Sequence, residues 1–411
     1  MRFLRLLVFV VLAPLFALAQ GQTIFGKVVR SDTKSVIQGA NVFFSNSSYA
    51  TATQFDGSFI LKNVKPGQYL LTIAHLGYAD YTETILVSDK QVEVRVEMAP
   101  KPIMLHEVNI TTKADWKRNY EMFKKQFIGT DENAKDCEVV NPDVLQFNYF
   151  NTQKRLEAYA DNFLVVDNRA LGYRVKFLVR DFKFDAIEGL IQYSGQKLFE
   201  ELPGSESEKK KWRYNRDMAY YGSAMHFFRA VGADRLEEEG FEMHRYTRYM
   251  NTQRPSEAAI MRAYDYYRAK GPADSVRKYV DLENTDRYSH EVFYHEPLFL
   301  SEVLSRTDKP GIFAFSFLDC MAIQYNRKRD DTHYRDIYLP LNVPNYETSI
   351  LSFMTREQAA KHTLFFDMNG IVVGNNPLME GTWSKARLSQ LLPVDYQPTP
   401  QDMPAAFFTK K

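Results

Sequence analysis

Apolar and polar residues alternate in short runs through the first quarter of this sequence, between Thr23 and Met98. The clearest run is the last one, where Val92, Val94 and Val96 are separated by charged residues. Three turn-forming pairs separate the runs at intervals of ten or eleven residues: Asp56-Gly57, Pro66-Gly67 and Gly77-Tyr78. Alternation with a period of two, broken at this spacing, predicts an antiparallel β-sandwich whose sheets each bury one face.

The pattern becomes helical from Ala114, where four aromatic residues recur at helical spacing: Trp116, Tyr120, Phe123 and Phe127. Strands follow between Asp143 and Glu201, and a hairpin is expected around Asn151-Thr152. Ser205 and Glu208 have the spacing of a capping box, which predicts a helix that runs to about Gly222. Helices and strands alternate without a regular strand-helix-strand repeat, so this region is predicted to have an α+β fold.

A second helix is expected from Ser223 to Val231, and a strand from Gly240 to Tyr249. The polar stretch from Asn251 to Ala273 is assigned no element. Four later segments have the pattern of strands: Ile312 to Leu318, Met321 to Tyr325, Ser349 to Met354, and Thr363 to Val373. The segment from Ser384 to Pro393 is predicted to be a short closing helix.

The helix after Ser205 allows side-chain predictions. Trp212 and Arg216 share one face, so Arg216 is expected to be partly buried and paired. Arg213 and Asp217 are four residues apart, which predicts an i, i+4 ion pair along the helix. Trp212, together with Phe227 and Phe228 of the next helix, is predicted to belong to the core of the second domain.

The N-terminus has the features of an export signal. Arg2 and Arg5 precede an almost wholly apolar run, Leu6 to Ala17, and Ala17-Leu18-Ala19 has the small-x-small form that signal peptidase cleaves. We therefore expect the mature chain to begin at Gln20. No other stretch reaches 18 apolar residues, so no transmembrane helix is expected after cleavage.

Composition narrows the range of functions. The net charge of +1 over 411 residues gives no general attraction for nucleic acid. Cys137 and Cys320, the two cysteines, allow either one long-range disulfide or two buried thiols, and we favour the thiols. Aromatic residues make up 14% of the chain, which suits either sheets with one wet face or surfaces that stack on sugars and proteins.

A family resemblance covers about 75 residues of the predicted sandwich. The residues that carry it are Gly26, Gly39-Ala40-Asn41-Val42, Asp56-Gly57, Phe59, Pro66-Gly67, Tyr69 and Gly77-Tyr78. In this order they resemble the carboxypeptidase-regulatory-like domain, a seven-stranded, transthyretin-like sandwich. The resemblance implies an accessory fold without catalytic residues. Gln54 stands where the family usually has Asp, which argues against a cation bound in this turn.

Three later segments resemble an uncharacterised family of exported bacterial proteins that carry this sandwich in front: NRALGYRVKF, KKKWRYNRDMAYYGSAMHFFRAV and GTWSKARLSQLLPVDYQP. That resemblance implies no known activity. Together the patterns divide the chain into a signal peptide (1–19), the sandwich (20–98), a linker (99–113), an α+β domain (114–395) and a tail (396–411).

No motif in the sequence identifies a catalytic or metal site. His290 and His295 in HEVFYH are five residues apart, whereas two zinc-binding histidines on a helix need a spacing of four. Gly222-Ser223-Ala224 lacks the second glycine of a nucleophile elbow. We therefore expect neither a metal nor another cofactor, and the catalytic residues of any activity stay unknown.

Two functions remain open on sequence grounds. The one we favour is an exported, non-catalytic binding or accessory protein of the bacterial cell envelope, whose ligand is an envelope or outer-membrane protein or a glycan. It would lie in the periplasm, at the outer membrane or in the medium. The alternative is an envelope hydrolase whose active site lies in the α+β domain, with Glu291 and His226 as candidate residues.

Overall fold

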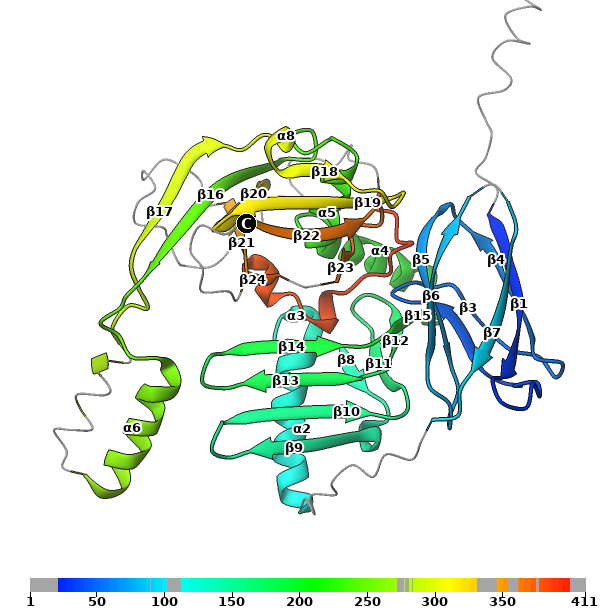
Figure 1. Ribbon diagram of the computed structural model, residues 1–411, viewed down its shortest axis with the longest axis horizontal. Coiled ribbons are helices and arrows are strands. Elements are labelled where there is room, and N and C mark those ends of the chain that lie inside the picture. The colour runs from blue at the N-terminus through cyan, green and yellow to red at the C-terminus, as the bar shows by residue number, and fades with distance from the viewer. Residues whose placement is uncertain are drawn as a thin grey trace, which may run out of the picture. The chain divides into compact units, whose positions relative to one another are not determined.

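The computed structural model describes residues 21–88, 90–101, 112–271, 277, 281–282, 284–330, 346–353, 361–374 and 377–399 (Figure 1). The predicted signal peptide lies outside these residues. The chain forms two compact units, Met1–Met104 and Leu105–Lys411. No helix of the described residues is long and apolar enough to cross a membrane.

The first unit is a sandwich of two sheets. Its strands are β1 (Gln22–Arg30), β2 (Asn41–Phe44), β3 (Ala50–Ala52), β4 (Ser58–Val64), β5 (Gly67–Ala74), β6 (Tyr81–Val87) and β7 (Val92–Met98). One sheet has the order β4-β1-β7, and the other has the order β3-β2-β5-β6. Strands β1 and β7 run parallel, while the other neighbours are antiparallel. The predicted all-β sandwich is confirmed.

The turn at Asp56-Gly57 requires a glycine for two reasons. Gly57 has a φ of +77°, a conformation that side chains resist. A Cβ atom there would lie 2.7 Å from the carbonyl oxygen of Val28. The Val28 N–H in turn donates to the Gly57 carbonyl at 2.9 Å, so the turn is fixed against β1.

Four sheets form most of the second unit. Their strands are β8 (Cys137–Val139), β9 (Leu145–Phe150), β10 (Arg155–Ala160), β11 (Leu164–Asn168), β12 (Tyr173–Phe177), β13 (Asp181–Asp185), β14 (Leu190–Ser194), β15 (Lys197–Glu201), β16 (Phe241–Met250), β17 (Tyr288–Pro297), β18 (Leu304–Arg306), β19 (Ile312–Leu318), β20 (Cys320–Arg329), β21 (Tyr346–Ser352), β22 (Lys361–Asp367), β23 (Val372–Val373) and β24 (Leu378–Gly381). The sheet orders are β14-β13-β10-β9, β15-β12-β11-β8, β17-β16-β20-β21-β24 and β18-β19-β22-β23.

Helices accompany these sheets, which confirms the predicted α+β class. They are α2 (Lys113–Ile128), α3 (Glu132–Lys135), α4 (Glu206–Tyr220), α5 (Ala224–Gly232), α6 (Glu257–Lys270), α8 (Leu300–Val303) and α9 (Thr382–Lys385), with 3-10 turns at Pro142–Val144 and Leu388–Gln390. Ser205 and Glu208 form the predicted capping box at the start of α4. The predicted hairpin is the antiparallel pair β9 and β10.

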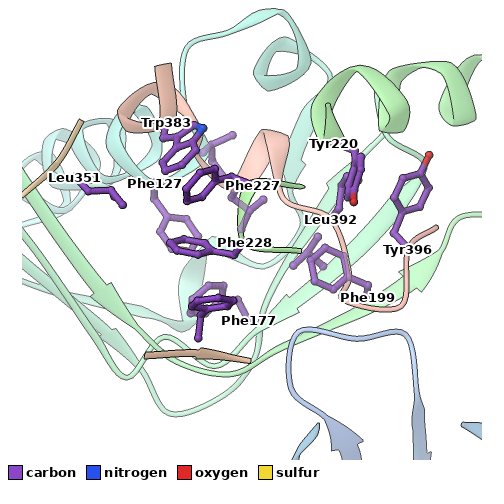
Figure 2. Packing of buried hydrophobic residues seen from close by; sticks show 14 of the residues in the cluster. Phe127, Phe177, Phe199, Tyr220, Phe227, Phe228, Leu351, Trp383, Leu392 and Tyr396 are labelled. Carbon is purple, nitrogen blue, oxygen red and sulfur yellow. The ribbon is translucent and has the colours of Figure 1, made fainter. Parts of the chain in front are cut away.

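Helix α5 lies at the centre of an aromatic core (Figure 2). Phe227 and Phe228 are fully buried, and both rings lie within 6.3 Å of the Trp383 ring and of the Phe315 ring. Trp212 of α4 is also buried. The prediction that Trp212, Phe227 and Phe228 belong to the core is therefore confirmed.

Two local predictions are wrong. The polar stretch from Asn251 contains helix α6, which Ser256 caps by accepting from the Ala259 N–H. Its periodicity is weak because Ile260 is its one fully buried residue among those described. The predicted closing helix is broken between α9 and the 3-10 turn. Within that 3-10 turn, the Ser389 carbonyl accepts from the Asn168 side chain at 2.9 Å, and the Ser389 hydroxyl donates to Asp131 at 2.6 Å.

The i, i+4 ion pair predicted between Arg213 and Asp217 is also wrong. Asp217 is buried, and its carboxylate accepts hydrogen bonds from the Tyr396 hydroxyl at 2.5 Å and the Thr399 hydroxyl at 2.6 Å. The backbone N–H of Thr399 donates to it at 3.0 Å. Asp217 therefore holds the C-terminal segment instead of pairing along the helix surface.

Candidate functional site

One face of the five-stranded sheet carries a row of polar and aromatic side chains that we call the polar face. Strand pairing places on it Glu242, His244, Tyr246 and Arg248 of β16, Glu291 and Phe293 of β17, Cys320 and Asn326 of β20, Ser352 of β21, and Glu380 of β24. At Phe241 and Met243, the opposite face is buried in the aromatic core. Two-residue alternation along β16 separates the two faces.

At one end of the polar face, several side chains contact Arg248. Its Nε donates to Glu291 at 3.0 Å, and its Nη1 donates to Glu380 at 2.6 Å, although β24 is three strands away from β16. The guanidinium carbon also lies 5.1 Å from the centre of the Tyr246 ring and 4.9 Å from that of Tyr288. Only 12% of the Arg248 side chain is exposed, so two ion pairs and two rings balance its loss of water.

The hydroxyl and thiol beside Arg248 are held in their protonated forms. Burial, and then the Glu291 carboxylate, raise the pKa of Tyr246. Burial raises the pKa of Cys320 to about 11. Because a thiol must lose its proton to act as a nucleophile, Cys320 has the properties of a buried structural thiol. Cys137 and Cys320 are both buried and free, as the favoured alternative for the cysteines predicted.

The other end of the polar face is built around Glu242. Its Oε1 accepts from the Asn326 amide at 2.7 Å, and its Oε2 lies 3.6 Å from Nε2 of His244, beyond hydrogen-bond distance. The His244 ring centre lies 5.0 Å from that of Phe293, which lies 6.3 Å from that of Tyr246. A continuous series of contacts thus runs from Asn326 to Glu380.

The two residues suggested for a hydrolase are not brought together. Glu291 lies on the polar face, whereas His226 of α5 packs against Phe241 and Tyr325 on the opposite face of the same sheet. Nδ1 of His226 accepts from the Gly222 N–H at 3.1 Å, and Nε2 lies 3.1 Å from a Glu239 oxygen. Both ring nitrogens are occupied, which leaves none to remove a proton from a substrate.

Burial lowers the pKa of His226 against the opposing effect of the Glu239 carboxylate. The histidine is therefore a neutral core residue whose tautomer is set by its two partners. Among the described residues, no three His, Cys, Asp or Glu side chains are grouped as they would be around a metal ion. His290 and His295 lie on the exposed strand β17.

The three segments that resemble an exported family meet at helix α4. Trp212, Asn215 and Arg216 donate to the carbonyl oxygens of residues 169, 170 and 171 at 2.7–2.8 Å. Arg216 also lies 3.8 Å from the centre of the Tyr173 ring and pairs with Glu201, as its predicted partial burial implied. Asp217 holds the third segment. These strongly patterned residues therefore fix the fold and do not form the candidate site.

Three solved structures align with this chain at low TM-scores. A protein of unknown function from Bacteroides fragilis NCTC 9343, described as membrane-associated, aligns over 88% of this chain and 99% of its own, at 8% identity and a TM-score of 0.17. A DUF3823 family protein from Bacteroides uniformis ATCC 8492 aligns over 80% of this chain and 96% of its own, at 10% identity and a TM-score of 0.15. The group B streptococcus pilus 2b backbone protein aligns over 20% of this chain, at 21% identity and a TM-score of 0.18. This chain spans only 42% of that protein's length.

No curated protein matches this chain. Residues 24–110 match the family model described as the CarboxypepD_reg-like domain. The match covers the sandwich, whose resemblance to that family is confirmed, and less than half of the chain. The first unit of this protein is therefore a carboxypeptidase-regulatory-like domain.

Proposed function

We propose that this protein is exported to the bacterial cell envelope and acts there by binding another molecule, not by catalysis. The observation that carries the proposal is the pairing of Glu291 and Glu380 with one arginine, Arg248. Each of these carboxylates accepts a hydrogen bond from the guanidinium, so part of its hydrogen-bonding capacity is committed to Arg248 and is not available to a substrate. The accessory character of the first unit's family supports the same function. The ligand is an envelope protein or a glycan.

Export is the part of this proposal that depends on the N-terminal sequence. Arg2, Arg5 and the apolar run that follows support cleavage after Ala19. Mass spectrometry of the protein isolated from its native cells tests this directly. We expect an N-terminus at Gln20 and recovery from the periplasm, the outer membrane or the medium. An intact Met1 in the cytoplasm would contradict export.

Binding is distinguished from turnover by measuring both the Tm of the protein and the chemical state of the ligand. The purified protein is melted in the presence of envelope oligosaccharides and purified envelope proteins. A ligand that binds the folded state raises Tm by mass action and is recovered chemically unchanged. Turnover of a peptide, ester or glycoside, abolished by one carboxylate substitution, would overturn the proposal.

A hydrolase is retained as the second candidate for one specific reason. Glu291 and Glu380 converge on Arg248 while 42% and 34% of their side chains stay exposed. Pairs of nearby carboxylates are used in glycoside hydrolysis. Glu291→Gln and Glu380→Gln would then each abolish turnover while the protein stays folded. If neither variant changes any measured activity, the hydrolase candidate fails.

A further inference from the structure

His244 is a buried side chain whose hydrogen-bonding capacity is unused. It is 5% exposed, and neither Nδ1 nor Nε2 has a hydrogen-bond partner within the described part of the chain. The nearest carboxylate, that of Glu242, is 3.6 Å from Nε2. Buried polar groups are normally satisfied, so an imidazole without partners indicates a missing molecule at this position.

The surroundings of His244 offer further unsatisfied or accessible groups. Oδ1 of Asn326 is buried and also has no hydrogen-bond partner among the described residues. The Glu242 side chain is 45% exposed, and Phe293 is 38% exposed. Donors, acceptors and an accessible aromatic ring therefore lie together at one end of the polar face.

We propose that this end of the polar face binds a carbohydrate. The inference rests on the proposed binding function and narrows it to one ligand class at one site. A sugar ring carries several hydroxyls, each of which donates one hydrogen bond and accepts others, so different hydroxyls of one ligand can satisfy the imidazole of His244, the Asn326 oxygen and the Glu242 carboxylate. The C–H face of the sugar ring packs on Phe293.

Other ligand classes fit the polar face less well. Its described residues include three carboxylates, Glu242, Glu291 and Glu380, against the single guanidinium of Arg248, so an anionic ligand is repelled. An apolar ligand would remove these charged groups from water without giving them partners. A neutral, polyhydroxylated ligand avoids both costs.

The key variant is His244→Phe, because phenylalanine has a similar ring and no nitrogens. If the imidazole is unpaired in the free protein, its replacement leaves no donor or acceptor unsatisfied, and Tm should stay the same or rise by about 2 °C or more. The same change removes the hydrogen bonds to the sugar, and affinity should fall by about tenfold or more. The matched control is His290→Phe, on exposed strand β17 outside the polar face.

The experiment uses the purified protein on an array of neutral, acidic and amino oligosaccharides, followed by calorimetry with the strongest neutral binder. Binding by the wild type and by His290→Phe, lost in a stable His244→Phe variant, supports the proposal. Equal binding by all three proteins overturns the site. A marked fall in the Tm of His244→Phe shows that the imidazole is already bonded, which also overturns it.

Failure of this inference can be separated from failure of the proposed function. If no oligosaccharide binds but a purified envelope protein raises Tm, carbohydrate recognition is wrong and the binding function stands. If the array sugars are cleaved and Glu380→Gln prevents it, the non-catalytic function is wrong. Glu380 lies at the other end of the polar face, so this substitution leaves His244 and its neighbours unchanged.

Discussion

Asp217 illustrates how one residue can have a role that its neighbours in sequence conceal. It lies one turn after Arg213 on an otherwise highly charged helix, the usual setting of an exposed i, i+4 pair. In the structure it is buried, and it accepts three hydrogen bonds from Tyr396 and Thr399. Its importance comes from donors about 180 residues away in the chain.

We predict that Asp217→Ala destabilises the protein by roughly 2–4 kcal/mol, because the buried Tyr396 hydroxyl and the two donors of Thr399 lose their acceptor. Arg213→Ala, on the exposed side of α4, is the control and should change the free energy of unfolding by less than about 0.5 kcal/mol. Denaturant unfolding at neutral pH measures both values. Similar losses in the two variants would mean that the exposed pair is the real interaction.

Asp367 gives a residue-scale prediction about pH. Burial raises the pKa of its carboxyl from the ordinary 3.8 to about 6, although the N–H groups of Asn369 and Ile371 donate to it. The folded state therefore binds this proton more tightly than the unfolded chain. The resulting stabilisation is fully present below about pH 4 and is lost as pH rises through about 6.

Asp367→Asn keeps a side-chain oxygen for both N–H groups and stays neutral at every pH. We expect the variant to be more stable than the wild type by roughly 1–3 kcal/mol above pH 6, and to match it near pH 4. Thermal unfolding of both proteins between pH 4 and pH 8 tests this. A difference between them that does not change with pH would be evidence against the raised pKa.

At the scale of elements, α4 is fixed to the turn between β11 and β12 by close approach as well as by hydrogen bonds. Gly172 in this turn has a φ of +69°, and a Cβ atom there would lie 2.1 Å from the Trp212 ring. Gly189, in the turn between β13 and β14, has nearly the same φ, +67°, but open space around it. A comparison of substitutions at these two glycines therefore distinguishes the cost of backbone strain from the cost of disturbing the packing of α4.

We predict that Gly189→Ala costs about 1–2 kcal/mol, which is the strain of a positive φ alone. Gly172→Ala should cost at least about 2 kcal/mol more, because Trp212 and α4 must also move. Chemical denaturation of the two variants gives the difference. Equal costs would show that α4 adjusts freely to the turn.

At the scale of the whole molecule, the division of the chain into two units has a direct test. Each sheet of the sandwich pairs with no strand of the second unit among the described residues. We predict that a fragment of residues 21–104 folds alone and gives a dispersed NMR spectrum. Gly57→Val in that fragment should destabilise it by roughly 1 kcal/mol or more, since Gly57 has a positive φ. A disordered fragment would show that the sandwich depends on the second unit.

The sequence by itself determined the sandwich, the α+β class and the capped helix α4, because these depend on local signals. Alternation along β7, the turn at Gly57 and the Ser205 capping box act over a few residues, so neighbouring residues suffice to recognise them. Helix α6 was missed because it has little buried surface, and an apolar stripe forms only where a helix packs.

Only the tertiary structure decided which polar residues lie together. Arg248, Glu291 and Glu380 come from three strands, and no spacing along the chain relates them. No spacing along the chain relates His244 to Asn326 either. The sequence suggested Glu291 and His226 together, but they lie on opposite faces of one sheet. Strand order and pairing register assign each side chain to a face, and both arise from long-range contacts that a linear pattern does not contain.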